Sequence, residues 1–401
     1  MWSKIVLLAL GTFAIGTDGF IVAGVLREIS HELDVPVVLA GQLVSLFAIV
    51  YALSGPLLAS LTAGWPRRRL LLVALAVFVL GNALAAVASS FAVLLLARVI
   101  AALASAAYTP CASFAAASLA GARHRGKALS LVMGGITVAT LVGVPLGTVL
   151  GASGGFRAAF WLVAGLGVLA FIGLYRWLPE LPGAPPVALR ERLRAVRLPG
   201  VPGTLLVTLL AMSAGFSVYT YLGPLLDRTL HADARMLAVV LVAFGIAGTL
   251  GNLASGWLAD HWGPARSVAL SLCVVALVLG LLPTLATTLG GTLFAVCLWN
   301  AAGWLLLPAQ QHRLLSMAGA AGPILLSLNA SAMYLGIGLA GLLGALVIQW
   351  WGVLALGPAG AVMVVLALLC HGWMLSAGRR SLASEQGYSS TLVPTEKQRY
   401  R

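Results

Sequence analysis

Long apolar runs recur along the whole chain, and they constrain its fold more than any other feature of the sequence. A helix needs about 20 mostly apolar residues to cross the hydrocarbon core of a bilayer. Runs that end at charged residues, Gly or Pro predict twelve such spans, near residues 5–26, 38–62, 70–90, 91–120, 128–151, 157–178, 202–226, 235–259, 266–287, 290–312, 322–348 and 352–376. With 61% hydrophobic and only 9% charged residues, the chain has too little polar surface for water, so a lipid bilayer is its expected solvent.

Basic residues fall unevenly on the two sides of the membrane that these spans define. If the N-terminus is cytoplasmic, 19 of the 24 lysines and arginines lie in cytoplasmic segments, four lie in outer segments, and Arg98 lies within a span. Cytoplasmic loops are enriched in Lys and Arg, so we expect both termini in the cytoplasm and a multi-pass protein of the plasma (inner) membrane. The net charge of +13 is spread over short loop clusters, which argues against nucleic acid as a partner.

The longest polar stretch between spans predicts a linker in the middle of the chain. The expected organisation is a six-span half at 1–178, a cytoplasmic linker at 179–201, a second six-span half at 202–376 and a cytoplasmic tail at 377–401. Gly64-Trp65 and Gly256-Trp257 follow the second span of each half. Such a correspondence indicates an internal repeat, as in many secondary transporters. The predicted fold class is an all-α membrane protein with twelve transmembrane helices in two pseudo-symmetric six-helix halves.

Three segments carry motifs of a known family. The loop after span 8 contains Gly256, Asp260 and Gly263, span 5 contains Gly143, Pro145, Gly147 and Gly151 in the run GVPLGTVLG, and span 1 contains the run GTDGFIVAG at 16–24. These segments resemble the major facilitator superfamily, and within it the bacterial drug:proton antiporters of the chloramphenicol-resistance and arabinose-efflux type. The chain departs from that pattern at 63–66, where the motif acid is missing, and at Gly19, where the subgroup often has Glu.

The resemblance implies the major facilitator fold and a function. A member of this group exports small organic compounds, such as drugs or antibiotics of the chloramphenicol type, in exchange for protons. It implies an antiporter motif at the four span 5 residues and a cytoplasmic gate at Gly256, Asp260 and Gly263. It also implies a protein driven by the proton gradient without a cofactor. The expected partners are protons, lipid and a small-molecule substrate, and the expected state is a monomer.

Asp18 is the only one of the eleven acidic residues that the predicted spans place deep in the membrane. A charged Asp at the centre of a helix costs about 2.5–3.5 kcal/mol on insertion scales, so the position suits a carboxyl that exchanges protons. The alternative is a carboxylate in a wet vestibule that accepts backbone hydrogen bonds. Arg98 is the only basic residue well inside a predicted span, and it is expected to pair with Asp18 or to influence proton release. Its alternative is to snorkel to the membrane interface.

Polar and aromatic residues inside the other spans are candidates for a substrate cavity. They are Tyr51, Tyr108, Ser217, Tyr221, Asn300, Trp304, Asn329 and Tyr334. An aromatic, weakly polar cavity would suit a neutral amphiphilic ligand. The alternative for each residue is an ordinary contact between membrane helices.

Enzyme motifs and metal-ligand patterns are missing from the sequence. There is no Walker A sequence for ATP hydrolysis, and none of the four cysteines forms a C-x-x-C pair, so neither an enzyme nor a metal site is predicted. Three other functions remain open: a sugar or sugar-phosphate exporter of the same fold, a nucleoside or metabolite transporter, and a receptor or scaffold that transports nothing.

Overall fold

This computed structural model describes residues 1–183, 190, 194–318 and 322–391, and most of these residues are helical. No strand occurs among those residues. The helices before the linker are α1 (Trp2–Gly24), α2 (Leu26–Glu32), α3 (Val37–Ala40), α4 (Gln42–Leu61), α5 (Arg67–Ala86), α6 (Phe91–Val138), the π-helical turn η1 (Ala139–Gly143) and α7 (Val144–Trp177). Those after it are α9 (Val201–Thr220), α10 (Leu222–Leu230), α11 (Ala234–Trp262), α12 (Pro264–Leu285), α13 (Leu289–Ala318), α14 (Gly322–Trp351), the 3₁₀ turn η3 (Val353–Ala355) and α15 (Leu356–Thr391).

The described chain contains eleven helical segments long and apolar enough to cross a membrane. The backbone of α6 leaves the helical conformation at Gly121, so the two parts of α6 belong to different segments. One of the eleven segments makes two crossings. That segment, His124–Trp177, has 54 residues, and its backbone leaves the helical conformation at Gly154 and Gly155. The chain reverses there, because a Cβ on Gly147 would lie 4.0 Å from the Cβ of Ala159, whereas twelve residues of straight helix would separate them by roughly 18 Å. Gly155 has φ of +75°, which only glycine adopts at little cost. The predicted twelve crossings are therefore confirmed.

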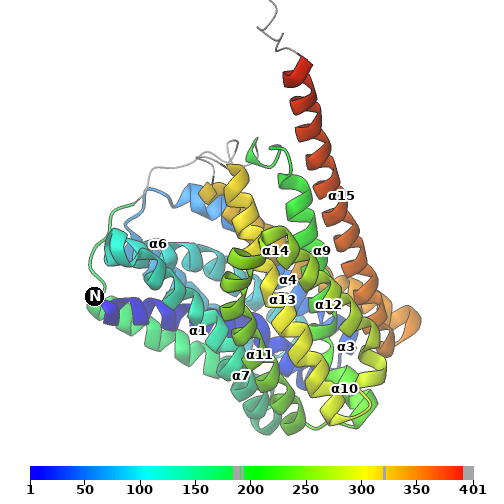
Figure 1. The fold of residues 1–401 in the computed structure, drawn as a ribbon. Coiled ribbons are helices and arrows are strands. Elements are labelled where there is room, and N and C mark those ends of the chain that lie inside the picture. The colour runs from blue at the N-terminus through cyan, green and yellow to red at the C-terminus, as the bar shows by residue number, and fades with distance from the viewer. Residues whose placement is uncertain (184–189, 191–193, 319–321, 392–401) are drawn as a thin grey trace, which may run out of the picture.

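Helices of the two halves lie side by side in the middle of the molecule (Figure 1). In the first half α1 and α5 both pack against α6 and α7, and in the second half α9 packs against α14 and α15 while α13 packs against α11 and α12. The two halves meet where α4 contacts α14 and where α11 contacts α7 and η1. The boundary at 179–201 stays a prediction, because most of the basic stretch of the linker lies outside the described residues. Beyond residue 376 the backbone of α15 continues as a helix to Thr391.

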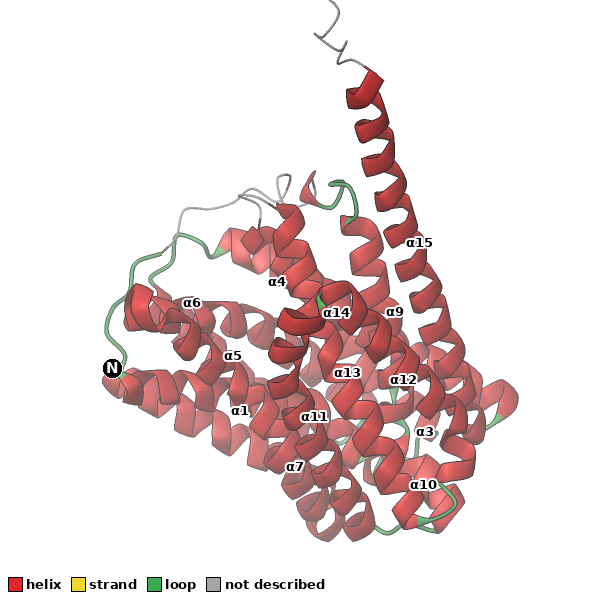
Figure 2. Cartoon of the chain, viewed as in Figure 1, coloured by secondary structure: helices red, strands yellow, loops and turns green. Residues whose placement is uncertain are grey.

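The two ends of the molecule differ in how closely the halves approach. We call the end with the linker and the loop at 62–66 the linker end, and the end with α2, α3 and α10 the far end (Figure 2). At the far end the Arg27 guanidinium lies 3.2 Å from the Asp227 carboxylate of the other half. Tyr221 of the second half also donates a hydrogen bond to the carbonyl of Val38 there, and nearer the middle of the molecule the rings of Tyr51 and Tyr334 stack. These side-chain contacts between the halves lie from the middle of the molecule to the far end.

Two predicted span ends differ from the structure. The span predicted at 202–226 ends at Thr220, and the short helix α10 follows it. The span predicted at 290–312 continues as α13 to Ala318. Arg313 therefore lies inside a helix and is only 7% exposed, whereas the sequence placed it in a cytoplasmic loop.

Candidate functional site

Asp18 on α1 and Arg98 on α6 form a buried ion pair in the first half. Arg98 Nη1 lies 2.5 Å from Asp18 Oδ1, and Arg98 Nη2 donates a hydrogen bond of 3.2 Å to the backbone carbonyl of Asp18. The two side chains are 0% and 1% exposed. The arginine therefore reaches the aspartate and does not extend to the membrane interface, so the pairing expected from the sequence is present.

Aromatic and amide groups surround this pair. The Arg98 guanidinium carbon lies 4.3 Å from the ring centroid of Phe47 and 5.9 Å from that of Phe160, and Asn82 on α5 lies close to the Asp18 carboxyl. Asp18 Oδ2 and Arg98 Nε have no hydrogen-bond partner among the described residues. Each charge therefore depends on the other, because removing one partner of a buried pair leaves an uncompensated charge.

The span 5 motif lies against the helix that carries Asp18. A Cβ on Gly143 would collide with Thr17 of α1, one on Gly147 with Ile21 of α1, and one on Gly151 with Val25, which directly follows α1. These three glycines therefore allow α7 and η1 to approach α1 closely.

Pro145 is the second residue of α7, which directly follows the π-helical turn η1. Proline cannot donate a backbone hydrogen bond, so its position agrees with the change of helix type there. The three glycines face α1 in the same half, while Thr140 and Leu141 of η1 contact Gly245 of the other half.

The predicted cytoplasmic gate is only partly described. Gly263 has φ of +82° and precedes α12, a backbone conformation that favours glycine. The side chain of Asp260, and the surroundings of Gly256, lie outside the part of the chain whose side chains the structure describes. Their gating role stays a prediction.

Three of the predicted cavity residues lie where the two halves meet. The rings of Tyr51 on α4 and Tyr334 on α14 stack with centroids 3.7 Å apart and an interplanar angle of 22°. The Tyr221 hydroxyl lies 2.9 Å from the carbonyl oxygen of Gly341 and 3.3 Å from that of Val38 in the other half. We call the Tyr51–Tyr334 stack the tyrosine contact.

The other predicted cavity residues make contacts inside one half. Three of them donate hydrogen bonds to backbone carbonyls: Tyr108 to Leu8 (3.1 Å), Ser217 to Ala214 (2.8 Å) and Asn300 to Phe244 (2.6 Å). Asn329 accepts a hydrogen bond from the Thr208 hydroxyl (2.9 Å), and Trp304 packs against Gly248. In this conformation four of these side chains join neighbouring helices, which is the alternative that the sequence left open, and the Ser217 bond stays within α9. Tyr108 is fully buried, so it lines no cavity here.

Comparison with known proteins decides the family. The sequence matches the model of the Major Facilitator Superfamily over residues 8–322. The chain belongs to this superfamily. It is 32% identical over 367 residues to the uncharacterized MFS-type transporter YbcL of Bacillus subtilis (strain 168), covering 91% of this chain and 94% of that protein. It is 33% identical over 365 residues to the inner membrane transport protein YdhP of Escherichia coli (strain K12), covering 90% and 93%.

Solved structures share the fold of this major facilitator protein. The human organic anion transporter MFSD10 (TETRAN) superposes with a TM-score of 0.70 at 18% identity, covering 92% of this chain and 98% of that one. A bacterial homolog of the human lysosomal transporter Spinster, in an inward-facing and occupied conformation, gives a TM-score of 0.76 at 18% identity, covering 93% and 96%. Members of the superfamily are transporters rather than enzymes. The chain is therefore a multi-pass membrane transporter for a small molecule.

Sequence reasoning missed the aromatic residues around the site. Phe20 on α1 lies 5.7 Å from Phe216 and 6.2 Å from Tyr219 of α9, centroid to centroid. The ring of Phe47 on α4 lies between the Arg98 guanidinium and the ring of Tyr51, which is on the same face of α4 as Phe47. The i, i+4 spacing of Phe47 and Tyr51 is the sequence signal that places both rings on one face of this span.

A second buried polar group in this transporter lies near the linker end of the second half. Arg313 Nη1 lies 2.8 Å from His371 Nδ1 and 3.3 Å from Gln310 Oε1, and His371 Nε2 lies 3.0 Å from the carbonyl of Ala265. No carboxylate lies within 4 Å of Arg313 among the described residues. A guanidinium only donates hydrogen bonds, so His371 Nδ1 is the acceptor and carries no proton. The imidazole of His371 is therefore neutral.

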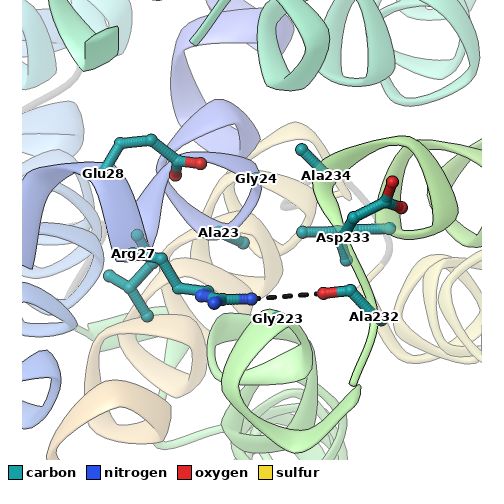
Figure 3. A pocket seen from close by; sticks show the side chains of 10 residues that line it. Ala23, Gly24, Arg27, Glu28, Gly223, Ala232, Asp233 and Ala234 are labelled. Carbon is teal, nitrogen blue, oxygen red and sulfur yellow. Dashed lines mark hydrogen bonds between the residues drawn. The ribbon is translucent and has the colours of Figure 1, made fainter. Parts of the chain in front are cut away.

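The far end of this transporter carries a small pocket between the halves (Figure 3). Arg27 donates a hydrogen bond of 3.2 Å to the carbonyl of Ala232 across it. Burial raises the pKa of the nearby Glu28 carboxyl above its usual range. These groups join α2 to α10 and its following loop, and they hold the far end of the two halves together.

Proposed function

We propose that this transporter exports small, mostly neutral organic compounds, such as drugs or antibiotics, across the plasma membrane in exchange for protons. The observation that carries the proposal is the buried ion pair of Asp18 and Arg98. It provides one carboxyl in the membrane interior whose charge depends on a single partner.

A proton on Asp18 would change the energy of this pair. Protonation removes the negative charge and leaves the Arg98 guanidinium without its anion inside a bundle of apolar helices. A buried charge without its partner is costly, so the protonated and deprotonated forms favour different arrangements of the helices. The membrane field adds about 2.3 kcal/mol per proton charge per 100 mV, which is sufficient to drive accumulation against a gradient of tenfold or more.

The basic residues support an orientation with the linker end in the cytoplasm. With Arg313 counted inside a span, 18 lysines and arginines lie on the linker side and four on the far side, which agrees with the positive-inside rule. Because the halves touch toward the far end, we infer that the conformation is inward-facing. The related bacterial structure named above is also inward-facing. A single chain carries both halves, so we propose that it works as a monomer.

The contact between the halves supports a neutral, partly aromatic substrate. Tyr51, Tyr334, Phe20 and Phe216 supply aromatic faces there, and such faces bind flat apolar groups. The human structural neighbour is an organic anion transporter. In the described chain the cation nearest to this region, Arg98, is already paired with Asp18, which favours neutral compounds over anions.

A resistance panel tests this function. The gene is expressed in a bacterial host that lacks its own drug pumps, and growth is measured against chloramphenicol and other antibiotics and dyes, with and without an uncoupler. We expect at least one compound to be tolerated at several-fold higher concentration, and the uncoupler to abolish the effect. Asp18→Asn should remove the resistance because Asn cannot carry a proton.

Asp233→Asn is the matched control for this panel. Asp233 caps α11 by accepting a hydrogen bond of 2.8 Å from the backbone N–H of Met236, and Asn caps helices equally well. This variant should export like the wild type. Export by Asp18→Asn at the wild-type rate would place the proton site elsewhere. Tolerance to sugars or nucleoside analogues, with none to drugs, would favour the alternative functions.

A further inference from the structure

Phe47 touches both the buried Asp18–Arg98 pair and Tyr51, the residue of the first half that forms the tyrosine contact. Its ring centroid lies 4.3 Å from the Arg98 guanidinium carbon and 6.4 Å from the ring centroid of Tyr51. Tyr51 in turn stacks on Tyr334 of the other half at 3.7 Å. Phe47 and Tyr51 are 3% and 8% exposed, so the rings form a continuous packed row from the charged pair to the second half.

We propose that Phe47 is a positioning residue that transmits the charge state of the Asp18–Arg98 pair to the tyrosine contact between the halves. This inference rests on the proton coupling proposed above. It adds the route by which a proton in the first half changes how that half meets the second.

The first step of this route is the response of Arg98. Among the described residues, Arg98 is the only charged group that faces Asp18. The elements around the pair present Phe47 from α4, Asn82 from α5 and Phe160 from α7. When Asp18 becomes neutral, the guanidinium keeps only the Asp18 carbonyl and the ring faces as partners. It must then move toward water or toward another acceptor, and the ring of Phe47 that lies against it must repack.

The second step uses the geometry of α4. Phe47 and Tyr51 are four residues apart and therefore lie on the same face of the helix, one turn apart. The nearest atom to a Cβ position on Gly19, the residue after Asp18, is Phe47 Cε1 at 3.8 Å. The ring is thus held between α1 and Arg98, and any repacking displaces it along α4 toward Tyr51. Packed cores respond by moving between discrete arrangements rather than by yielding gradually.

Phe160 provides an internal comparison for this route. Its ring centroid lies 5.9 Å from the same guanidinium carbon, but its recorded ring neighbour is Phe156 on the same helix, at 6.2 Å. A variant of Phe160 therefore removes an aromatic face from Arg98 without interrupting the row that leads to Tyr334.

The test measures the distance between the halves without any substrate. Full-length protein carries Leu61→Cys and Gln311→Cys, both exposed positions toward the linker end, with the native cysteines replaced. After spin labelling and reconstitution in liposomes, the distance distribution is recorded across a pH titration. In the Phe47→Leu variant we expect the pH-dependent change in the ratio of the two populations to fall about 30-fold, the size of a desolvated cation–π contact. Phe160→Leu should respond like the parent, and Phe47→Tyr should restore the response.

Phe47→Met provides a second variant if Phe47→Leu does not fold, since Met fills the same space and lacks a ring. A parent protein that shows no pH-dependent change would overturn the proton coupling itself, and the relay with it. A parent that responds, together with Phe47→Leu and Phe47→Met variants that respond equally, would overturn the relay and leave proton coupling intact. Equal losses in Phe47→Leu and Phe160→Leu would also overturn it, because the effect would then come from Arg98 alone.

Discussion

Asp18 and Arg98 hold opposite charges inside an apolar bundle, and each stabilises the other. Replacing Asp18 with Asn should leave the guanidinium without its anion. We expect Asp18→Asn to lower the free energy of unfolding by about 3–5 kcal/mol, measured as thermal unfolding of the purified protein in detergent.

The double variant is the control for this prediction. Asp18→Asn combined with Arg98→Met removes both charges, and replacing both members of a buried pair is often neutral. The double variant should therefore recover most of the lost stability. An additive loss in the double variant would mean that the two side chains do not interact in the folded protein.

At the scale of residues, the sequence predicted the charged pair but not its surroundings. Asp18 and Arg98 were found because acidic and basic residues are rare inside apolar runs. The same argument does not find Arg313, because the predicted span ends beside it at residue 312. Its burial depends on His371, 58 residues away, and one sequence does not reveal such a distant partner. The tyrosine contact was predicted as two separate cavity residues for the same reason.

At the scale of helices, α11 and η1 approach each other so closely that only glycine fits. A Cβ on Gly245 would lie 2.6 Å from the Cα of Leu141 and 2.8 Å from the carbonyl oxygen of Thr140. Backbone atoms cannot rotate out of the way, so Gly245→Ala must push the two helices apart. We expect a loss of about 1–3 kcal/mol in unfolding free energy and a shift of the labelled linker end toward shorter distances.

Gly165→Ala is the matched comparison for that change. Gly165 is exposed on α7 and has no atom within 4 Å of a Cβ position. The substitution should raise stability by about 0.5–1 kcal/mol, because Ala favours the helix more than Gly does. If Gly245→Ala unfolds at the same temperature as Gly165→Ala, the close approach of α11 to η1 does not support the contact between the halves.

The helices themselves could be predicted almost to their ends. Apolar run length is set by the thickness of the bilayer, and nearly all spans lie within a few residues of their predicted bounds. The end of α9 could not be predicted, because Tyr221 and the apolar residues after it continue the run while the backbone already leaves the helix at Tyr221 (φ −108°, ψ 22°). Hydropathy shows that α10 is apolar, but it does not show that the chain changes direction between α9 and α10.

At the scale of the molecule, the two halves touch at a place where they can be joined covalently. A Cβ on Gly341 of α14 would lie 3.5 Å from the Cβ of Ser45 on α4, within the range that disulfides span. The double variant Ser45→Cys with Gly341→Cys should crosslink under oxidant and hold the far end closed. Alternating access requires this end to open, so transport of a compound identified in the resistance panel should stop.

Reduction and the single variants provide the controls for the crosslink. Dithiothreitol should restore transport in the double variant, and Ser45→Cys alone should transport with or without oxidant. Peptide mass mapping checks that the bond has formed. Wild-type transport by fully crosslinked protein would contradict a mechanism in which the far end opens.

The arrangement of two six-span halves followed from counting spans and from the repeat after the second span of each half. Which end was closed did not follow from the sequence, because it depends on contacts between residues far apart in the chain, such as Arg27 with Asp227 and Tyr51 with Tyr334. Those contacts change as a transporter works, while the sequence stays the same.

Arg313 places a positive charge among the described helices of the second half. Among the described residues this charge has only a neutral imidazole and an amide beside it and no carboxylate. A voltage across the membrane exerts a force on such a charge, worth up to about 2.3 kcal/mol per 100 mV for a full crossing. Even a partial displacement of the second half then makes its resting position depend on how strongly the cell is energised, before any proton or cargo has bound.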